Sequence, residues 1–229
     1  MLLSRSEKIK VSKKEQGFSL IELMIVVLII CIMSVISIIS LRGEKKYLAD
    51  DQAYKILDIL NEARQRALTQ HETMRVEFNK TQNIVQLISE NAPGDAADDQ
   101  VIKSLSLADA KDVVVGDTPA NVDTAPSEMS PTPVLNFKQS KHPLSLTNSV
   151  ATLRFVTNGT VLDAGSNSIG KNAALTGATI YVWSPNYSNN NTPLNTGNII
   201  RALTVQGTSG LSRYTKCALV NNRCGNWIQ

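Results

Sequence analysis

The chain has 229 residues, of which 42% are hydrophobic and 19% are charged. This composition is typical of a globular protein and argues against a disordered chain. The length is enough for one good-sized domain plus an anchor. The formal net charge of +3 comes from residues 1–17, where five basic residues stand against two acidic ones. The rest of the chain is therefore neutral in sum.

Charge is distributed unevenly along this neutral remainder. Residues 90–128 hold nine acidic and two basic residues, whereas residues 129–229 hold eight basic residues and one acidic residue, Asp163. Blocks of like charge usually form solvated surface or tails. A basic C-terminal face that binds an anionic partner is the alternative, and both interpretations stay open.

An apolar run follows the basic N-terminus. Residues 18–41 carry one charge, Glu22, and no Gly or Pro. A helix of this length spans roughly 36 Å, enough to cross a hydrocarbon core of about 30 Å. The run is too long for a secretory signal and no small-residue cleavage site follows it. It therefore predicts a transmembrane helix. Five basic residues before the run against three after it place the N-terminus in the cytoplasm.

Glu22 stands five residues into this run, where a carboxylate costs about 2.5–3.5 kcal/mol on insertion scales. An ionisable group in such a place usually has a function, and a tolerated interfacial acid is the alternative. "KKEQG" at 13–17 followed by "FSLIEL" at 18–23 resembles the class III signal of type IV prepilins and type II secretion pseudopilins. In that family a basic leader ends in Gly, the mature chain begins with Phe, and Glu is its fifth residue.

The resemblance implies processing and assembly. A membrane prepilin peptidase would cut between Gly17 and Phe18 and N-methylate Phe18. Glu22 would then lie opposite the N-terminal ammonium of a neighbouring subunit, a pairing that offsets much of the cost of burying its charge. Major pilins often carry Gly and Pro in this stretch. Their absence here favours a minor subunit or a pseudopilin.

The rest of the chain reads as a helix followed by strands. Apolar residues at i, i+3 and i+4 continue the helix to about residue 70, and the only breaker in it is Gly43. Alternation predicts strands near 73–79 and 84–89, and Asn158-Gly159 predicts a hairpin turn. Later strands are expected within 178–186 and 198–214. These elements predict an α+β fold in which a long N-terminal helix packs on an antiparallel β-sheet of six or seven strands, a pilin-like roll.

This order of motifs is similar to GspH/FimT-type pseudopilins over most of the chain, except residues 90–135. The expected organisation is a cytoplasmic leader peptide at 1–17, a transmembrane helix at 18–41, its periplasmic continuation at 42–72, and a β-rich head at 73–229 with a long acidic loop at 90–135. Within that loop, Asp112–Val115 is the one short β-like run. The loop is rich in Pro, Asp, Ala and Ser, which predicts partial disorder.

Three cysteines are present. Cys217 and Cys224 lie outside the cytoplasm in the predicted topology, and there a disulfide closing their short loop is expected. Cys31 lies in the apolar run and reads as a small apolar residue. No catalytic constellation, metal site or cofactor motif appears, so the chain is not expected to be an enzyme.

Nucleic acid is a possible partner for the basic C-terminal half. Some FimT-type members bind DNA through a C-terminal Gly-Arg-x-Arg. The matching residues 210–213 here read Gly-Leu-Ser-Arg, so one of the two arginines is missing. Arg213, Lys216 and Arg223 are the candidate phosphate contacts.

The sequence thus favours a minor pilin or pseudopilin that primes or joins a type IV pilus. The alternatives are a minor pseudopilin of a type II secretion system and a DNA-binding minor pilin in DNA uptake. The expected partners are the prepilin peptidase, other major and minor pilins or pseudopilins, inner-membrane lipid and, under the DNA-uptake alternative, DNA. The protein is expected in the bacterial inner membrane, with its head in the periplasm, and then in the pilus or pseudopilus.

Overall fold

A computed structural model describes the chain over 19–90, 98–110, 112–116, 150–165, 170–186, 192–193, 199–220 and 223–228. Within these ranges the side chains of 35–46, 186, 192–193, 220, 223 and 225–226 are not described. The chain divides into two compact units, Met1–Arg42 and Gly43–Gln229. The second unit is called the head below.

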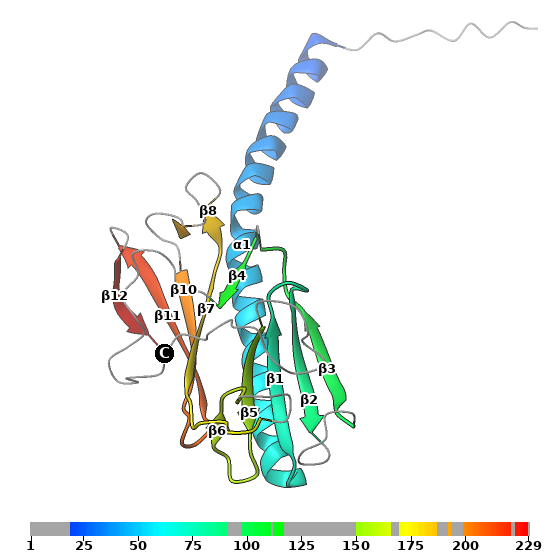
Figure 1. The fold of residues 1–229 in the computed structure, drawn as a ribbon. Helices are drawn as coiled ribbons and strands as arrows, with labels where there is room; N and C mark the ends of the chain where they lie inside the picture. The colour runs from blue at the N-terminus through cyan, green and yellow to red at the C-terminus, as the bar shows by residue number, and fades with distance from the viewer. Residues whose placement is uncertain are drawn as a thin grey trace, which may run out of the picture. The chain divides into compact units, whose positions relative to one another are not determined.

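One helix and twelve strands make up the described part (Figure 1). Helix α1 is Leu20–Gln70, an uninterrupted helix of 51 residues, so Gly43 does not end it. The strands are β1 Thr73–Asn79, β2 Ile84–Glu90, β3 Gln100–Ser106, β4 Val114–Gly116, β5 Val150–Phe155, β6 Val161–Leu162, β7 Ala178–Trp183, β8 Pro185–Asn186, β9 Thr192–Pro193, β10 Ile199–Val205, β11 Ser212–Val220 and β12 Arg223–Ile228.

The predicted α+β architecture is confirmed, with antiparallel pairing throughout these strands. The expectation of one sheet with six or seven strands was wrong. Two five-stranded sheets form, sheet A in the order β3-β2-β1-β5-β6 and sheet B in the order β12-β11-β10-β7-β4, beside a small β8-β9 pair. β3 also lies inside the segment 90–135 that was expected to hold no strand except near Asp112–Val115. The remainder of that segment, at 91–97, 111 and 117–135, lies outside the described residues.

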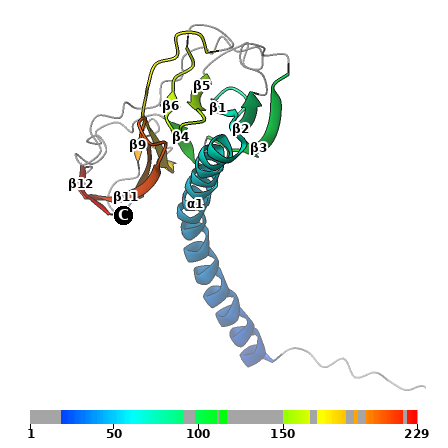
Figure 2. The same cartoon turned by 90° about the horizontal axis from the view of Figure 1, so that it is seen from below.

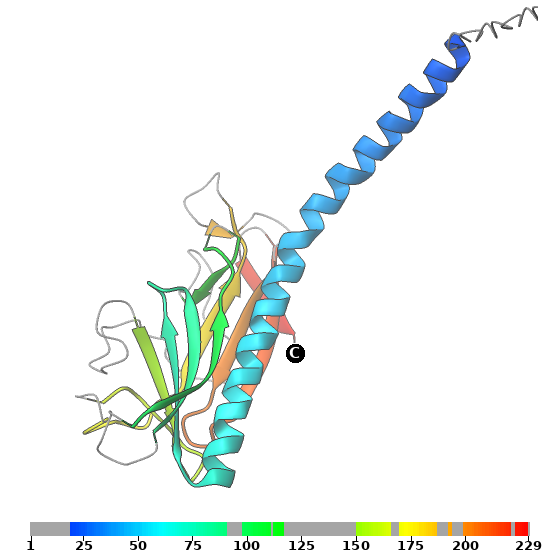
Figure 3. The same cartoon turned by 90° about the vertical axis from the view of Figure 1, so that its right-hand side faces the viewer.

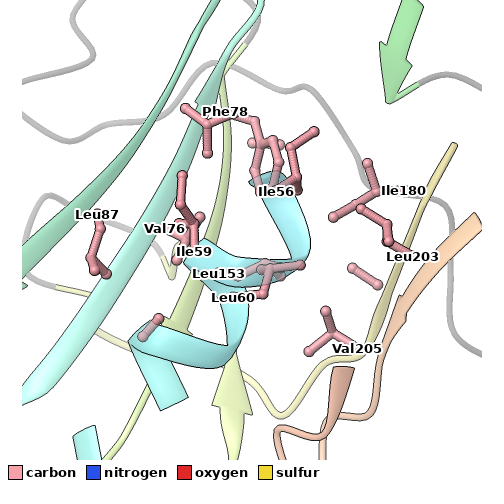
Figure 4. Packing of buried hydrophobic residues seen from close by; sticks show 14 of the residues in the cluster. Ile56, Ile59, Leu60, Val76, Phe78, Leu87, Leu153, Ile180, Leu203 and Val205 are labelled. Carbon is pink, nitrogen blue, oxygen red and sulfur yellow. The ribbon is translucent and has the colours of Figure 1, made fainter. Parts of the chain in front are cut away.

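The second half of α1 lies between the two sheets (Figures 2 and 3). Ile56, Ile59 and Leu60 are at most 1% exposed and point into the core. Figure 4 shows sheet A supplying side chains such as Val76 and Phe78 on one side of the helix, and sheet B supplying Ile180, Leu203 and Val205 on the other. The helix therefore provides the apolar surface on which both sheets are held.

The turns of the two sheets meet near the end of α1. The Val161 amide donates to the Gly207 carbonyl at 2.7 Å, which joins β6 to the β10–β11 turn. Gly159 has φ +83°, and the Asn158-Gly159 hairpin turn predicted from the sequence is present between β5 and β6. A Cβ on Gly210 would lie 2.6 Å from the Gly159 carbonyl oxygen. The backbone can make this close approach because residue 210 is glycine, and the φ of +83° at Gly159 is one that glycine adopts readily.

The edge strand β3 is fastened to α1 by charge. The Lys103 ammonium donates to Asp58 and to Glu62, each at 2.9 Å. These two acids lie one turn apart on α1, so one cation holds both. The hydrogen bond from Lys103 lowers the pKa of the Glu62 carboxyl. Both partners of the Lys103–Asp58 pair are well exposed, at 40% and 69%, so the contact contributes little to stability.

Sheet B is joined to α1 by a buried arginine. Arg201 on β10 is fully buried, and its Nε donates to the Asp50 carboxylate at 2.6 Å. The Tyr214 hydroxyl on β11 donates to the same oxygen at 3.1 Å, and its ring stacks on Tyr54 with centroids 5.0 Å apart. Asp50 therefore fixes the helix against two neighbouring strands.

This contact gives the head an acid-sensitive component of stability. The hydrogen bond from Arg201 is the main cause of a lowered pKa for Asp50. A lowered carboxyl pKa contributes stability that is present above the unfolded value, about 3.9, and is lost as pH falls through the lower folded value. We expect the free energy of unfolding to decrease below about pH 4, and Asp50→Asn to flatten this decrease. Urea unfolding of the head from pH 2.5 to 6 measures both.

The control for this prediction is Asp51→Asn. Asp51 is exposed and pairs with Lys55 on the helix surface. Its variant is expected to keep the slope of the unaltered head, because exposed i,i+4 pairs contribute little. The pKa of the Glu62 carboxyl is also lowered, so Asp50→Asn removes only part of the decrease of unfolding free energy with falling pH. A variant with the full wild-type slope would contradict the assignment to Asp50.

The outer face of sheet A carries a buried charged cluster. The alternation that predicted β1 places Arg75 and Glu77 on this face, and both are buried, at 0% and 2%. Arg75 lies directly opposite Arg154 in the ladder, a pairing of like charges. Glu90 resolves this conflict because its carboxylate contacts both guanidinium groups, at 2.5 Å and 3.0 Å. Burial raises the pKa of the Glu90 carboxyl, against the effect of the two arginines.

Candidate functional site

The candidate site is the start of α1. Gly17 and Phe18, the predicted cleavage and methylation positions, lie outside the described residues. The helix begins immediately after them: the Ser19 carbonyl accepts hydrogen bonds from the Glu22 amide at 3.0 Å and the Leu23 amide at 3.2 Å. Ser19 is therefore the residue that opens the helix, and any chain end at Phe18 would stand one residue before it.

Glu22 lies in the first turn of α1 and is exposed. The first helical turn carries unpaired amide N–H groups and the positive end of the helix dipole. A carboxylate is stabilised at this end. The structure thus places the one charge of the apolar run where its own helix tolerates it best.

The apolar residues after Glu22 are exposed on every side of the helix. Large hydrophobic side chains from Leu20 to Met33 have exposed fractions between 48% at Val26 and 79% at Leu20. A contiguous exposed apolar surface of this size marks a site for lipid or for another protein. This half of the helix is therefore built for contacts outside its own chain.

Among the side chains that the structure describes, no helical stretch is both long and apolar enough to cross a membrane. The transmembrane helix predicted over 18–41 falls partly on Phe18 and on residues 35–41. Phe18 and the side chains of 35–41 lie outside the described set.

The disulfide between Cys217 and Cys224 is present, as predicted. It joins β11 to β12 with Cα atoms 5.8 Å apart. It sits at a register shift in the ladder, where Cys217 pairs with Trp227 but Leu219 pairs with Cys224. The ring of Trp227 packs against that of Tyr181, with centroids 6.2 Å apart, on the face of sheet B that points away from α1. The bridge therefore closes the hairpin that holds Trp227 over this second apolar cluster.

The candidate DNA contacts do not form one patch. Arg213 and Lys216 are both exposed on β11, but an odd spacing of three residues puts them on opposite faces of the strand. Lys216 shares a face with Tyr214 and lies near enough to affect Asp50 electrostatically. The side chain of Arg223 on β12 lies outside the described set. DNA binding stays a prediction.

Across the described ranges, no group of three His, Cys, Asp or Glu side chains is placed to hold a metal ion. Cys31 is a free, exposed cysteine. The sequence analysis did not predict the two charged contacts of the head, at Asp50 and at Arg75. The one sequence signal for the contact at Arg75 was a basic and an acidic residue, Arg75 and Glu77, at alternate positions of a predicted strand.

Comparison with known proteins bears on this N-terminal segment. Residues 12–38 match the family model described as the prokaryotic N-terminal methylation motif. No curated protein is significantly similar in sequence to the whole chain. Among solved structures, the crystal structure of the type IV minor pilin FimU from Pseudomonas aeruginosa (strain PAO1) matches with 13% identity and a TM-score of 0.38, over 76% of this chain and 90% of that one.

The matched segment contains Gly17, Phe18 and Glu22 and runs into the exposed apolar half of α1. Such a motif implies a precursor anchored in the inner membrane, processing by a prepilin peptidase, and assembly with other pilins. Residues 12–38 of the chain therefore carry a prokaryotic N-terminal methylation motif, and this segment holds the predicted cleavage and methylation positions.

Proposed function

We propose that this protein is a minor subunit of a type IV pilus that helps to prime filament assembly. The observation that carries the proposal is the methylation motif at 12–38, which includes the start of a helix whose described large apolar side chains from Leu20 to Met33 are exposed. Cleavage between Gly17 and Phe18 would leave a free amine on Phe18, two residues before Leu20, the first residue of that helix. The exposed half then packs beside the helices of other subunits.

Glu22 is the residue that selects the neighbour in this proposal. A carboxylate among apolar side chains needs a cation, because an unpaired buried charge is costly. The N-terminal ammonium of the adjacent subunit supplies one. Attraction between these groups is strong in a low dielectric, so the pair fixes the axial position of one helix against the next.

Two features support a minor rather than a major subunit. The apolar run has neither Gly nor Pro, and α1 continues without a break from Leu20 to Gln70. The closed Cys217–Cys224 loop and the basic C-terminal half favour a pilus over a secretion pseudopilus. The same proposal places the protein in the GspH/FimT-type subfamily, because the motifs along the chain follow the order found in that subfamily.

The test is the yield of surface filaments sheared from a strain that lacks the gene, beside the same strain complemented with the full-length chain. We expect a loss of more than about tenfold, restored by the wild-type gene. Glu22→Ala is expected not to restore it, because the incoming ammonium has no partner. Gly17→Ala is expected not to restore it either, because its leader stays uncut.

Asp51→Ala is the matched control for Glu22→Ala, since it removes an exposed acid from the same helix. It should restore filaments to the complemented level. Immunoblotting for each variant in the membrane fraction shows that the protein is present. An unchanged filament yield in the deleted strain, with loss of a secreted protein instead, would transfer the proposal to a type II secretion pseudopilus.

A further inference from the structure

We propose that Asn158 is a site of spontaneous covalent modification, in which the Asn158–Gly159 step of the β5–β6 turn forms a succinimide and Thr160 promotes the reaction. This is the one Asn-Gly step in the sequence. Residues of the turn itself supply all the reacting groups except water. The inference therefore does not rest on the proposed function.

The Asn158 side chain is held by the residue two positions after it. Its Oδ1 accepts hydrogen bonds from the Thr160 amide at 3.0 Å and from the Thr160 hydroxyl at 2.8 Å. Such local bonds from an asparagine side chain to the backbone two residues on form an Asx turn. Asn158 is also exposed, so water reaches its side chain. The side-chain carbonyl therefore has two donors on its oxygen and lies in contact with solvent.

The reaction joins the Gly159 nitrogen to the Asn158 side chain. The Gly159 amide loses its proton to a solvent base, and its nitrogen forms a bond to Cγ of Asn158. The Cγ–Nδ2 bond then breaks, and the leaving nitrogen takes a proton from water and departs as ammonia. Negative charge develops on Oδ1 in the tetrahedral intermediate, where the two Thr160 donors stabilise it as the donors of an oxyanion hole do. Glycine leaves the path of the nitrogen clear, because it has no side chain.

The folded turn limits the rate of the first step. The Gly159 amide donates to the Val156 carbonyl at 2.8 Å, and Gly159 is buried beside Leu68. The amide proton becomes available to a base when this hydrogen bond opens, which is a local event at a hairpin turn. The contacts between Asn158 and Thr160 span three residues and do not include this bond. They therefore persist when the turn opens.

The products change the place where the turns of the two sheets meet. Water adds across either C–N bond of the succinimide ring and gives aspartate or isoaspartate at position 158. Isoaspartate adds a methylene group to the main chain. Beside it, the Val161 amide donates to the Gly207 carbonyl at 2.7 Å, and a Cβ on Gly210 would already lie 2.6 Å from the Gly159 carbonyl oxygen. A longer main chain is expected to weaken this junction.

The experiment follows the mass of the tryptic peptide that begins after Arg154, in the full chain kept in detergent micelles at neutral pH. Fragmentation locates the change from amide to acid at Asn158, and an isoaspartate-specific methyltransferase detects isoaspartate. Hydrogen exchange at the Gly159 amide in the same samples measures how often the turn opens. We expect both products to accumulate in the unaltered chain. Asn158→Gln should be far slower, because its longer side chain must close a larger ring.

Variants of Thr160 separate a chemical role from a structural one. Thr160→Val is expected to slow modification about fivefold relative to turn opening, which is the usual effect of one hydrogen bond. Thr160→Ser keeps the hydroxyl and should retain the wild-type rate. Thr157→Val is the matched control, because it removes the hydroxyl of an exposed threonine in the same turn, and it should leave the relative rate unchanged.

A purely structural Thr160 would give a different result. Its loss would then speed turn opening and modification together, so that the rate of modification relative to opening stays constant in Thr160→Val. That outcome would overturn the inference, as would an unaltered chain in which Asn158 stays an amide while the Gly159 amide exchanges.

Discussion

Replacement of Arg75 by methionine is expected to lower the free energy of unfolding of the head by about 3–5 kcal/mol. Arg75 is fully buried and contacts three carboxylates: Glu77 at 2.8 Å, Glu90 at 2.5 Å and Asp99 at 3.1 Å. Methionine fills much of the same volume but removes the charge. The three carboxylates then stay buried without the cation that offsets the free-energy cost of burying their charge.

Urea unfolding of the head, residues 43–229, measures this loss. Lys55→Met is the matched control, because it also changes a cation to methionine. Lys55 pairs with Asp51 on the surface of α1, with half of each side chain exposed. Its replacement should cost less than about 0.5 kcal/mol. A loss below about 1 kcal/mol for Arg75→Met would show that the cluster is compensated in another way.

The second large effect is expected at the centre of the core. Leu60 is fully buried on α1, between side chains of sheet A and sheet B (Figure 4). Leu60→Ala should lower the free energy of unfolding by about 2–5 kcal/mol, because it removes buried methyl groups and leaves a cavity. A helix held between two sheets has little freedom to move into that cavity, so the upper half of this range is expected.

Leu57→Ala is the control for this substitution. Leu57 lies one turn earlier on the same helix and is half-buried, so the chemical change is the same and the cavity smaller. It should cost no more than half as much as Leu60→Ala in the same urea experiment. Equal losses at the two positions would mean that helix propensity, not packing between the sheets, controls the result.

The sequence predicted well the features that depend on local patterns. A helix reaching about residue 70 follows from apolar spacing without a strong breaker, and α1 ends at Gln70. The turn at Asn158-Gly159 follows from the positive φ that glycine adopts. The Cys217–Cys224 bridge follows from two cysteines close in sequence. The motif at 12–38 is a local pattern as well.

Features that depend on distant residues could not be predicted in the same way. Asp50 and Arg201 lie 151 residues apart, and the residues next to each of them in the sequence give no indication that the two form a pair. β3 was missed because its apolar residues alternate poorly and stand next to an acidic segment. Its pairing with β2 also contains a register shift. The split into two sheets is set by which strands meet across α1, and strand patterning alone carries no such information.

The order in which strands enter the two sheets has a consequence for folding. β1, β2 and β3 belong to sheet A, β4 to sheet B, β5 and β6 again to sheet A, and β7 and β10 to β12 again to sheet B. β4 has no partner until β7 is made, because Val114 pairs with Trp183. Pairings so distant in sequence are slow to form. During synthesis β1 must wait for β5 and the helix for the strands of sheet B that follow residue 177, so the surface of the helix that packs on sheet B stays uncovered until the last part of the chain is made.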